Sequence, residues 1–125
     1  MLMSEREHRV PGPDHPITIT PTAGEVVVRV GGDVVARTTA ALTLQESTYP
    51  AVQYVPLADV DERFLRPSAT RTWCPYKGEA SYWTLTAGGA EQADAVWGYP
   101  DASPAVASIA GHVAFYPDRV DLTVG

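Results

Sequence analysis

The residues of this chain best suited to chemistry lie in one short stretch, Cys74-Pro75-Tyr76-Lys77-Gly78. A thiol near an ammonium group has its thiolate favoured, which is how proteins make reactive cysteines. Pro75 fixes its own φ and Gly78 permits a positive φ, so the stretch predicts a stiff bend that aims Cys74 and Lys77 in fixed directions. The simpler interpretation makes Cys74 a small buried hydrophobic residue and Lys77 a solvated turn residue. Both are catalytic candidates: Cys74 as nucleophile or redox thiol, Lys77 as an imine-forming amine.

Carboxylates supply further candidates for acid–base chemistry. Glu79 sits beside the bend, and Glu46 directly precedes the sequence S-T-Y-P, at the expected end of a strand, where loops commonly meet ligands. Either could pair with Lys77, although surface ion pairs are common and carry little meaning alone. Glu46 is the third catalytic candidate, and we expect it to orient Lys77.

All but one of the tyrosines and tryptophans lie between positions 49 and 99. Several of them lining one concavity would make flat walls suited to rings or cations, whereas in a small β domain such residues also fill the core. Tyr82 and Trp83 are neighbours on an expected strand and must point opposite ways, so only one of them can face a pocket. The candidate ligand-binding residues are Tyr49, Tyr54, Lys77, Tyr82 and Tyr99.

Short strands and turns must position these side chains. The 11 prolines and 10 glycines divide the chain into short elements. Residues 26–30 and 33–37 predict an antiparallel hairpin across Gly31-Gly32, because glycines adopt the positive φ values that hairpin turns require. Residues 16–21 predict an edge strand, further strands are expected near 42–44, 52–55, 81–87 and 120–124, and residues 58–64 suggest a helical turn.

One helix is expected near the C-terminus. Ser103 is a suitable N-cap and Pro104 fits the first helical position. A single apolar face is then formed over roughly ten residues by Ala105, Val106, Ile109, Ala110 and Val113. The fold class is therefore mostly β: a single small domain of antiparallel strands with one short helix. We expect residues 1–10 to form a flexible N-terminal tail and residues 11–125 the single β domain.

Composition narrows the possible partners. The net charge is −6 and Lys and Arg form no cluster, so neither nucleic acid nor an anionic membrane surface is an expected partner. The single cysteine makes no internal disulfide and no Cys-rich zinc site, and no phosphate-loop motif is present. We expect no metal and no cofactor. Without an 18-residue apolar run or a signal-peptide pattern, the expected location is cytoplasmic, and the oligomeric state stays open.

Five motifs then appear in an order that resembles one family. They are P-G-P-D-H-P-I-T-I (11–19), L-T-L-Q-E-S-T-Y-P (42–50), C-P-Y-K-G-E-A-S-Y-W (74–83), A-V-W-G-Y-P (95–100) and A-F-Y-P-D-R-V-D (114–121). The chain resembles domain-of-unknown-function family 427, sometimes labelled a nucleotidyltransferase domain. The resemblance covers about 110 residues, and its most specific part is the Cys-Pro-aromatic-Lys-Gly core.

The resemblance implies a fold and a set of motif positions. The implied fold is β-tent-like, as in methionine-R-sulfoxide reductases and the drug-binding domain of cereblon. Many proteins with this fold hold a zinc ion between two CxxC knuckles. This chain has no CxxC knuckle, so the resemblance implies no metal. The family's motif residues correspond here to Glu46, Tyr49, Pro50, Tyr54, Cys74, Pro75, Lys77, Gly78, Tyr82, Tyr99, Pro100, Tyr116 and Arg119.

The leading hypothesis is a small-molecule-binding β domain whose aromatic pocket is bounded by the Cys-Pro-Tyr-Lys-Gly bend. In this hypothesis Lys77 supplies a positive charge for an anionic or carbonyl-bearing ligand. The alternative is a small enzyme that uses Cys74 or Lys77 for redox or nucleophilic chemistry, or for the nucleotidyl transfer that the family label suggests. A third possibility is an accessory protein that acts through protein contacts.

Overall fold

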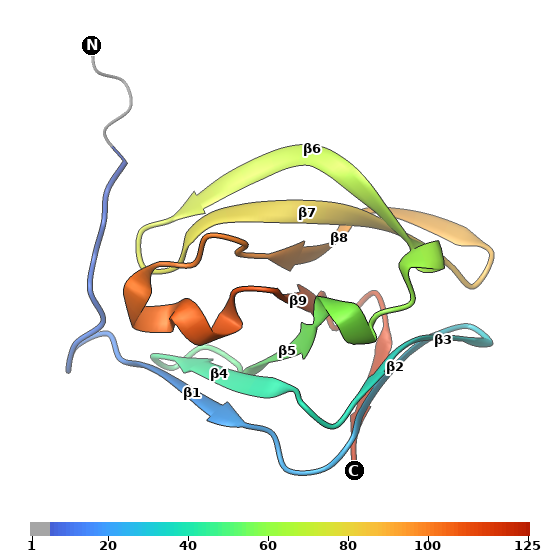
Figure 1. Cartoon of the computed structure of the whole chain (residues 1–125), viewed down its shortest axis with the longest axis horizontal. Helices are drawn as coiled ribbons and strands as arrows, with labels where there is room; N and C mark the ends of the chain where they lie inside the picture. Colours follow the sequence, from blue (N-terminus) through green and yellow to red (C-terminus); the bar gives the residue numbers. More distant parts are fainter. Residues whose placement is uncertain (1–5) are drawn as a thin grey trace.

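A computed structural model describes residues 6–125 and shows, over that range, strands joined by short loops and three 3-10 helices (Figure 1). The fold is mostly β, as the sequence predicts. The strands are β1 (Ile17–Pro21), β2 (Val26–Val30), β3 (Asp33–Thr38), β4 (Leu42–Glu46), β5 (Val52–Pro56), β6 (Leu65–Cys74), β7 (Gly78–Ala87), β8 (Ala90–Gly98), β9 (His112–Phe115) and β10 (Asp121–Val124). The helices are η1 (Leu57–Asp59), η2 (Glu62–Phe64) and η3 (Pro104–Ile109).

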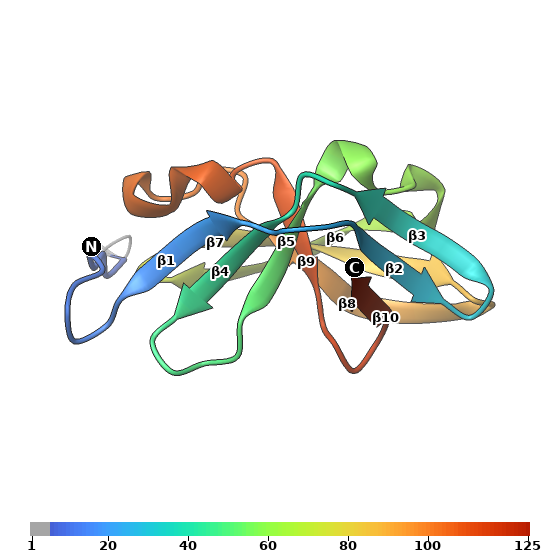
Figure 2. The ribbon, with the colours of Figure 1, turned by 90° about the horizontal axis from the view of Figure 1, so that it is seen from below.

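These strands form two antiparallel sheets. Seven strands follow the order β1-β4-β5-β9-β8-β7-β6, and a smaller sheet has the order β10-β2-β3. In Figure 1 the larger sheet runs from β6 at the top to β1 at the bottom, with the smaller sheet at the lower right. The β4–β5 and β9–β10 loops project from one side of the molecule, opposite the three 3-10 helices (Figure 2).

The hairpin predicted across Gly31-Gly32 is confirmed. Val30 pairs with Asp33, and Gly31 has a φ of +59°. β1 is confirmed as an edge strand that pairs only with β4 among the described residues. The helical turn suggested for residues 58–64 is present as η1 and η2.

The helix expected near the C-terminus is not confirmed as a regular helix. Residues 104–109 form a 3-10 helix, Val106 has non-helical dihedral angles, and the Ser103 side chain caps nothing. The helix ends because Ala110 leaves the helical region and Gly111 has a φ of +77°. Val113, expected on the helix face, belongs to β9 instead. The predicted burial of Ile109 is nonetheless confirmed, since its exposure is 0%.

Two apolar clusters make up the core. The first joins the two sheets, because Val28 and Val35 of the smaller sheet pack with Val55, Leu85 and Val96 of the larger one. The second places Val106 and Ile109 of η3 against Leu44, Tyr54 and Ala114 of the larger sheet. This second cluster supports the residues that form the site described below.

The segment before β1 also makes defined contacts. The expected flexible tail covers residues 1–10, of which 1–5 lie outside the described residues. The backbone N–H of Arg9 donates to the Pro75 carbonyl at 2.9 Å, and the Trp73 indole N–H donates to the Glu7 carbonyl at 2.8 Å. Within residues 6–125, no helix is long and apolar enough to cross a membrane.

Candidate functional site

A cavity of about 730 Å³ opens between the β4–β5 loop and the β9–β10 loop. We call it the site cavity. Tyr49 and Pro50 of the first loop and Tyr116 and Pro117 of the second line its mouth. Tyr49 is 57% exposed and Tyr116 is 38% exposed. Deeper in the wall are buried residues of the larger sheet, which include Leu44, Tyr54 and Phe115.

Strand register explains which side chains share this cavity. Leu44 and Glu46 alternate along β4 and therefore project from the same face of the sheet. On the other side of the cavity Tyr82 of β7 lies directly opposite Trp97 of β8, so both also share a face. Tyr99, just after β8, completes this wall.

The structure brings together most of the candidate residues. Those that line the site cavity are Glu46, Tyr49, Tyr54, Lys77, Tyr82 and Tyr99. Cys74 does not line it: its half-buried side chain packs against the second core cluster. Glu79 instead forms an exposed ion pair with Arg6 at 3.0 Å, and Arg119 contacts Asp118 at 3.9 Å.

The bend that carries Lys77 is the turn of the β6–β7 hairpin. Cys74 pairs with Gly78 across a three-residue loop, and Gly78 has a φ of +109°. A β-carbon at Gly78 would lie only 3.2 Å from the Asp101 carbonyl oxygen. The Lys77 carbonyl accepts a hydrogen bond from the Ser103 N–H at 3.0 Å, which ties the bend to the start of η3. This hydrogen bond fixes the direction in which Lys77 leaves the hairpin.

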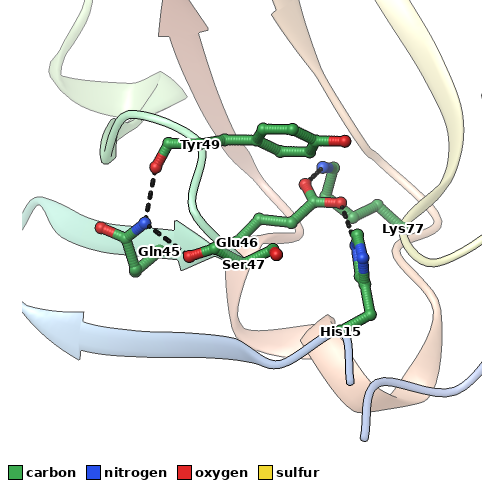
Figure 3. A network of polar contacts seen from close by, with 6 residues as sticks. All are labelled: His15, Gln45, Glu46, Ser47, Tyr49 and Lys77. Atoms are coloured by element: carbon green, nitrogen blue, oxygen red, sulfur yellow. Dashed lines mark hydrogen bonds and ion pairs between the residues drawn. The ribbon is translucent and has the colours of Figure 1, made fainter. Parts of the chain in front are cut away.

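Lys77 and Glu46, which both line the cavity, form a partly buried ion pair (Figure 3). The Lys77 Nζ donates to Glu46 Oε1 at 2.5 Å, and their side chains are 11% and 13% exposed. Lys77 Nζ also lies 5.8 Å from the centre of the Tyr99 ring. The contact expected between Glu46 and Lys77 is therefore present. Lys77 is not the solvated turn residue of the simpler interpretation.

His15 completes this polar group from the segment before β1. Its Nε2 lies 2.8 Å from Glu46 Oε2, so each carboxylate oxygen has its own partner. The imidazole stacks on Tyr76 of the bend, with ring centres 4.2 Å apart and planes 12° apart. Tyr76 thus supports His15 and does not line the cavity.

Electrostatics keep Glu46 ionised. Burial raises the pKa of this carboxyl, but the hydrogen bonds and positive charge of Lys77 and the contact with His15 outweigh burial and lower the pKa overall. A lowered pKa means that Glu46 carries its negative charge at neutral pH. The Lys77–Glu46 pair then contributes no net charge to the cavity.

The deeper tyrosines stay neutral. Burial is the largest cause that raises the pKa of Tyr54 and of Tyr99 well above the usual value, and the charge of Glu46 adds to both shifts. The pKa of Tyr116 is also raised, by burial and by neighbouring Tyr82. A neutral phenol keeps its proton, so these residues present O–H donors and apolar faces.

Gln45 holds the loop that carries Tyr49. Its side-chain N–H group donates to the carbonyls of Ser47, at 3.1 Å, and Tyr49, at 2.5 Å. Ser47 has a φ of +48°, a conformation that few non-glycine residues adopt. From this loop the Tyr49 side chain extends toward the Lys77–Glu46 pair, as Figure 3 shows.

Trp97, Tyr116 and His15 are among the site residues that were not predicted. Trp97 and Tyr116 line the cavity, and both stand in the motifs that carried the family resemblance. Their ring centres lie 4.5 Å apart. His15 also stands in such a motif, but its contact with Glu46 spans 31 positions, which no local pattern could reveal. Within residues 6–125, no group of three or more His, Cys, Asp or Glu side chains could hold a metal ion.

Comparison with known families gives one match. A family model described as "Domain of unknown function (DUF427)" matches residues 18–125. The comparison with curated proteins finds no match. The matched range includes every cavity-lining residue, whereas His15 lies just before it.

Proposed function

The chain belongs to the DUF427 family, and from that premise we propose that it is a small-molecule-binding domain whose ligand occupies the site cavity. One observation carries the proposal: a partly buried Lys77–Glu46 ion pair stands in the lining of a cavity walled by tyrosines and a tryptophan. Ligand sites in proteins typically combine apolar and aromatic walls with a few fixed polar groups.

Size supports a small organic ligand. Small-molecule sites usually enclose about 300–1,000 Å³, and the site cavity of about 730 Å³ falls inside this range. Flat aromatic walls favour a planar ring, which stacks on them with offset or edge-to-face geometry. We therefore propose a planar organic molecule as the ligand.

The ion pair supports binding more than it supports folding. A buried ion pair is often no more stabilising than apolar residues of similar volume, because both charges lose their hydration. In a cavity, the same pair offers N–H donors in a fixed direction. We infer that Lys77 contacts the ligand and that Glu46 orients Lys77.

An NMR screen of aromatic fragments tests the proposal. We expect binding to shift resonances of the cavity residues, and Tyr49→Ala and Tyr116→Ala each to weaken binding several-fold. Both residues are exposed at the mouth, so their removal leaves the fold intact. Leu57→Ala is the matched control, since Leu57 is 38% exposed, like Tyr116, but lies outside the site cavity. Equal weakening by all three variants, or the absence of any bound fragment, would contradict the proposal.

The alternative, an enzyme, gains no support from the site geometry. Cys74 does not line the site cavity, and a Lys77 ammonium that donates to a carboxylate has no free lone pair with which to attack a carbonyl. No observation favours nucleotidyl transfer. The cytoplasmic location and the absence of nucleic-acid and membrane partners stay predictions.

We also propose that the fold is β-tent-like, as the family resemblance implies. Its support is the pair of antiparallel sheets that share one apolar cluster. Superposition of an experimental structure on a methionine-R-sulfoxide reductase tests this, and a different strand order in the shared sheets would contradict it.

A further inference from the structure

Near Lys77, the site cavity contains hydrogen-bond donors that have no acceptor within the part of the chain that the structure describes. The Lys77 ammonium carries three hydrogens, and Glu46 Oε1 accepts only one of them. Within residues 6–125 the Tyr99 hydroxyl makes no hydrogen bond, although Tyr99 is only 7% exposed and no buried polar atom lacks a partner. Tyr99 lines the site cavity together with Lys77, whose Nζ lies 5.8 Å from the centre of its ring, so this hydroxyl can donate to a ligand there. A ligand atom near Lys77 must accept hydrogen bonds.

The same part of the cavity has no uncompensated positive charge. Glu46 is ionised and compensates Lys77, and among the described residues the lining contains no second positively charged side chain. A ligand carboxylate that reached Lys77 would also lie beside the Glu46 carboxylate. Like charges at such separation repel strongly in a partly buried site, where the effective dielectric constant is low. The acceptor that fits is therefore an uncharged oxygen.

We propose, on the basis of the function proposed above, that the ligand is a neutral, planar compound whose carbonyl oxygen accepts hydrogen bonds from Lys77 and Tyr99. The carbonyl lone pairs meet the free hydrogens of the ammonium and the phenol, while the ring lies between the aromatic walls. Glu46 is then the specificity-determining residue, because its charge excludes carboxylates of the same shape.

Two probes of equal shape test this assignment: 2-naphthamide, which is neutral, and 2-naphthoate, which carries a carboxylate. Affinities are measured by protein-detected NMR titration at one fixed pH for both probes and all variants. For the unmodified chain we expect the amide to bind about tenfold or more tightly than the carboxylate. For Glu46→Gln we expect the carboxylate to gain at least about tenfold, because the Lys77 charge is no longer compensated.

Asp121→Asn is the matched control. It removes one negative charge from the cavity lining but leaves the Lys77–Glu46 pair in place. We expect this variant to keep the preference for the amide. A carboxylate gain as large as that of Glu46→Gln would overturn the role of Glu46.

The outcomes separate this inference from the proposed function. Tighter binding of the naphthoate to the unmodified chain overturns the inference, as does binding of other aromatic fragments in the cavity while naphthamide fails to bind. In both cases the small-molecule function stands. If no aromatic fragment enters the cavity, the function fails and the inference fails with it. Should Glu46→Gln not fold, the comparison of the two probes on the unmodified chain still decides.

Discussion

Lys77 and Glu46 stabilise each other only as a pair. Removing one partner of a buried ion pair leaves the other charge without compensation. We expect Lys77→Met to lower the free energy of unfolding by about 1–3 kcal/mol. Urea denaturation of Lys77→Met, of Glu46→Gln and of the double variant Lys77→Met/Glu46→Gln measures this. The double variant should lose less than the single one, and a simple sum of the single losses would contradict the pairing.

The lowered pKa of Glu46 predicts a defined pH dependence. The folded chain binds the Glu46 proton more weakly than the unfolded chain does. The carboxylate therefore contributes its full stability above the unfolded pKa of about 4.3, and the contribution is lost as pH falls through the lower folded value.

Denaturation of the unmodified chain and of Glu46→Gln between about pH 7 and pH 3 isolates this contribution. The difference between the two unfolding free energies should be constant at neutral pH and shrink toward the acid end. A difference that grows between about pH 5 and pH 3 would show that Glu46 has a raised pKa in the folded chain.

At the scale of elements, the β6–β7 turn depends on Gly78 both for its positive φ and for the small space beside it. Alanine substitutions at three glycines distinguish these two effects. Gly78 has a positive φ and a close neighbour, Gly89 has a positive φ of +76° and open space, and Gly32 has open space without the positive φ. We expect Gly32→Ala to change stability by less than about 0.5 kcal/mol and Gly89→Ala to cost about 1 kcal/mol. Gly78→Ala should cost clearly more than Gly89→Ala. Thermal denaturation ranks the three variants, and equal losses at Gly78 and Gly89 would mean that the Asp101 contact relaxes freely.

Ile109 anchors η3 to the larger sheet. Its side chain is fully buried in the second core cluster. Ile109→Ala should lower the free energy of unfolding by roughly 2–5 kcal/mol, through lost burial and the cavity that remains. Ser108→Ala, at an exposed neighbouring position, is the control and should stay within about 0.5 kcal/mol. A near-zero shift for Ile109→Ala in the melting temperature would mean that η3 does not stabilise the core.

Local sequence patterns predict some strands and helices of this chain better than others, for physical reasons. The glycine hairpin was predictable because a turn and its flanking alternation are local. β6 was not predicted, since an edge strand with a Pro and mostly exposed residues shows little alternation. The expected helix is longer than the observed one because the apolar spacing continues through Gly111 into β9. Gly111, whose positive φ ends the helix, does not interrupt that spacing.

For the site, residue types were more predictable than contacts. Lysine, glutamate and tyrosines near bends are visible in a sequence, and the expected Glu46–Lys77 contact is present. The burial of that pair and the approach of His15 depend on β1 and the β6–β7 turn meeting in space. Only the three-dimensional pairing of distant strands determines this.

At the scale of the whole molecule, the two sheets should unfold together. The first core cluster contains residues of both sheets, so neither sheet keeps its apolar face covered alone. We expect urea unfolding followed by circular dichroism and by methyl NMR signals from each sheet to give one midpoint. Val28→Ala, in the smaller sheet, should lower the midpoint of every signal equally. Separate transitions would show that residues 11–125 do not behave as one cooperative domain.

Trp97 gives the molecule an optical property of its own. Its indole stands in the wall of the site cavity, whereas Trp73 contacts the segment before β1 and Trp83 packs against the first core cluster. Indole emission responds to the polarity of its surroundings, so a ligand that displaces water beside Trp97 changes its fluorescence. With Trp73→Phe and Trp83→Phe, the single remaining indole would report directly, and without any added dye, whether the cavity is filled.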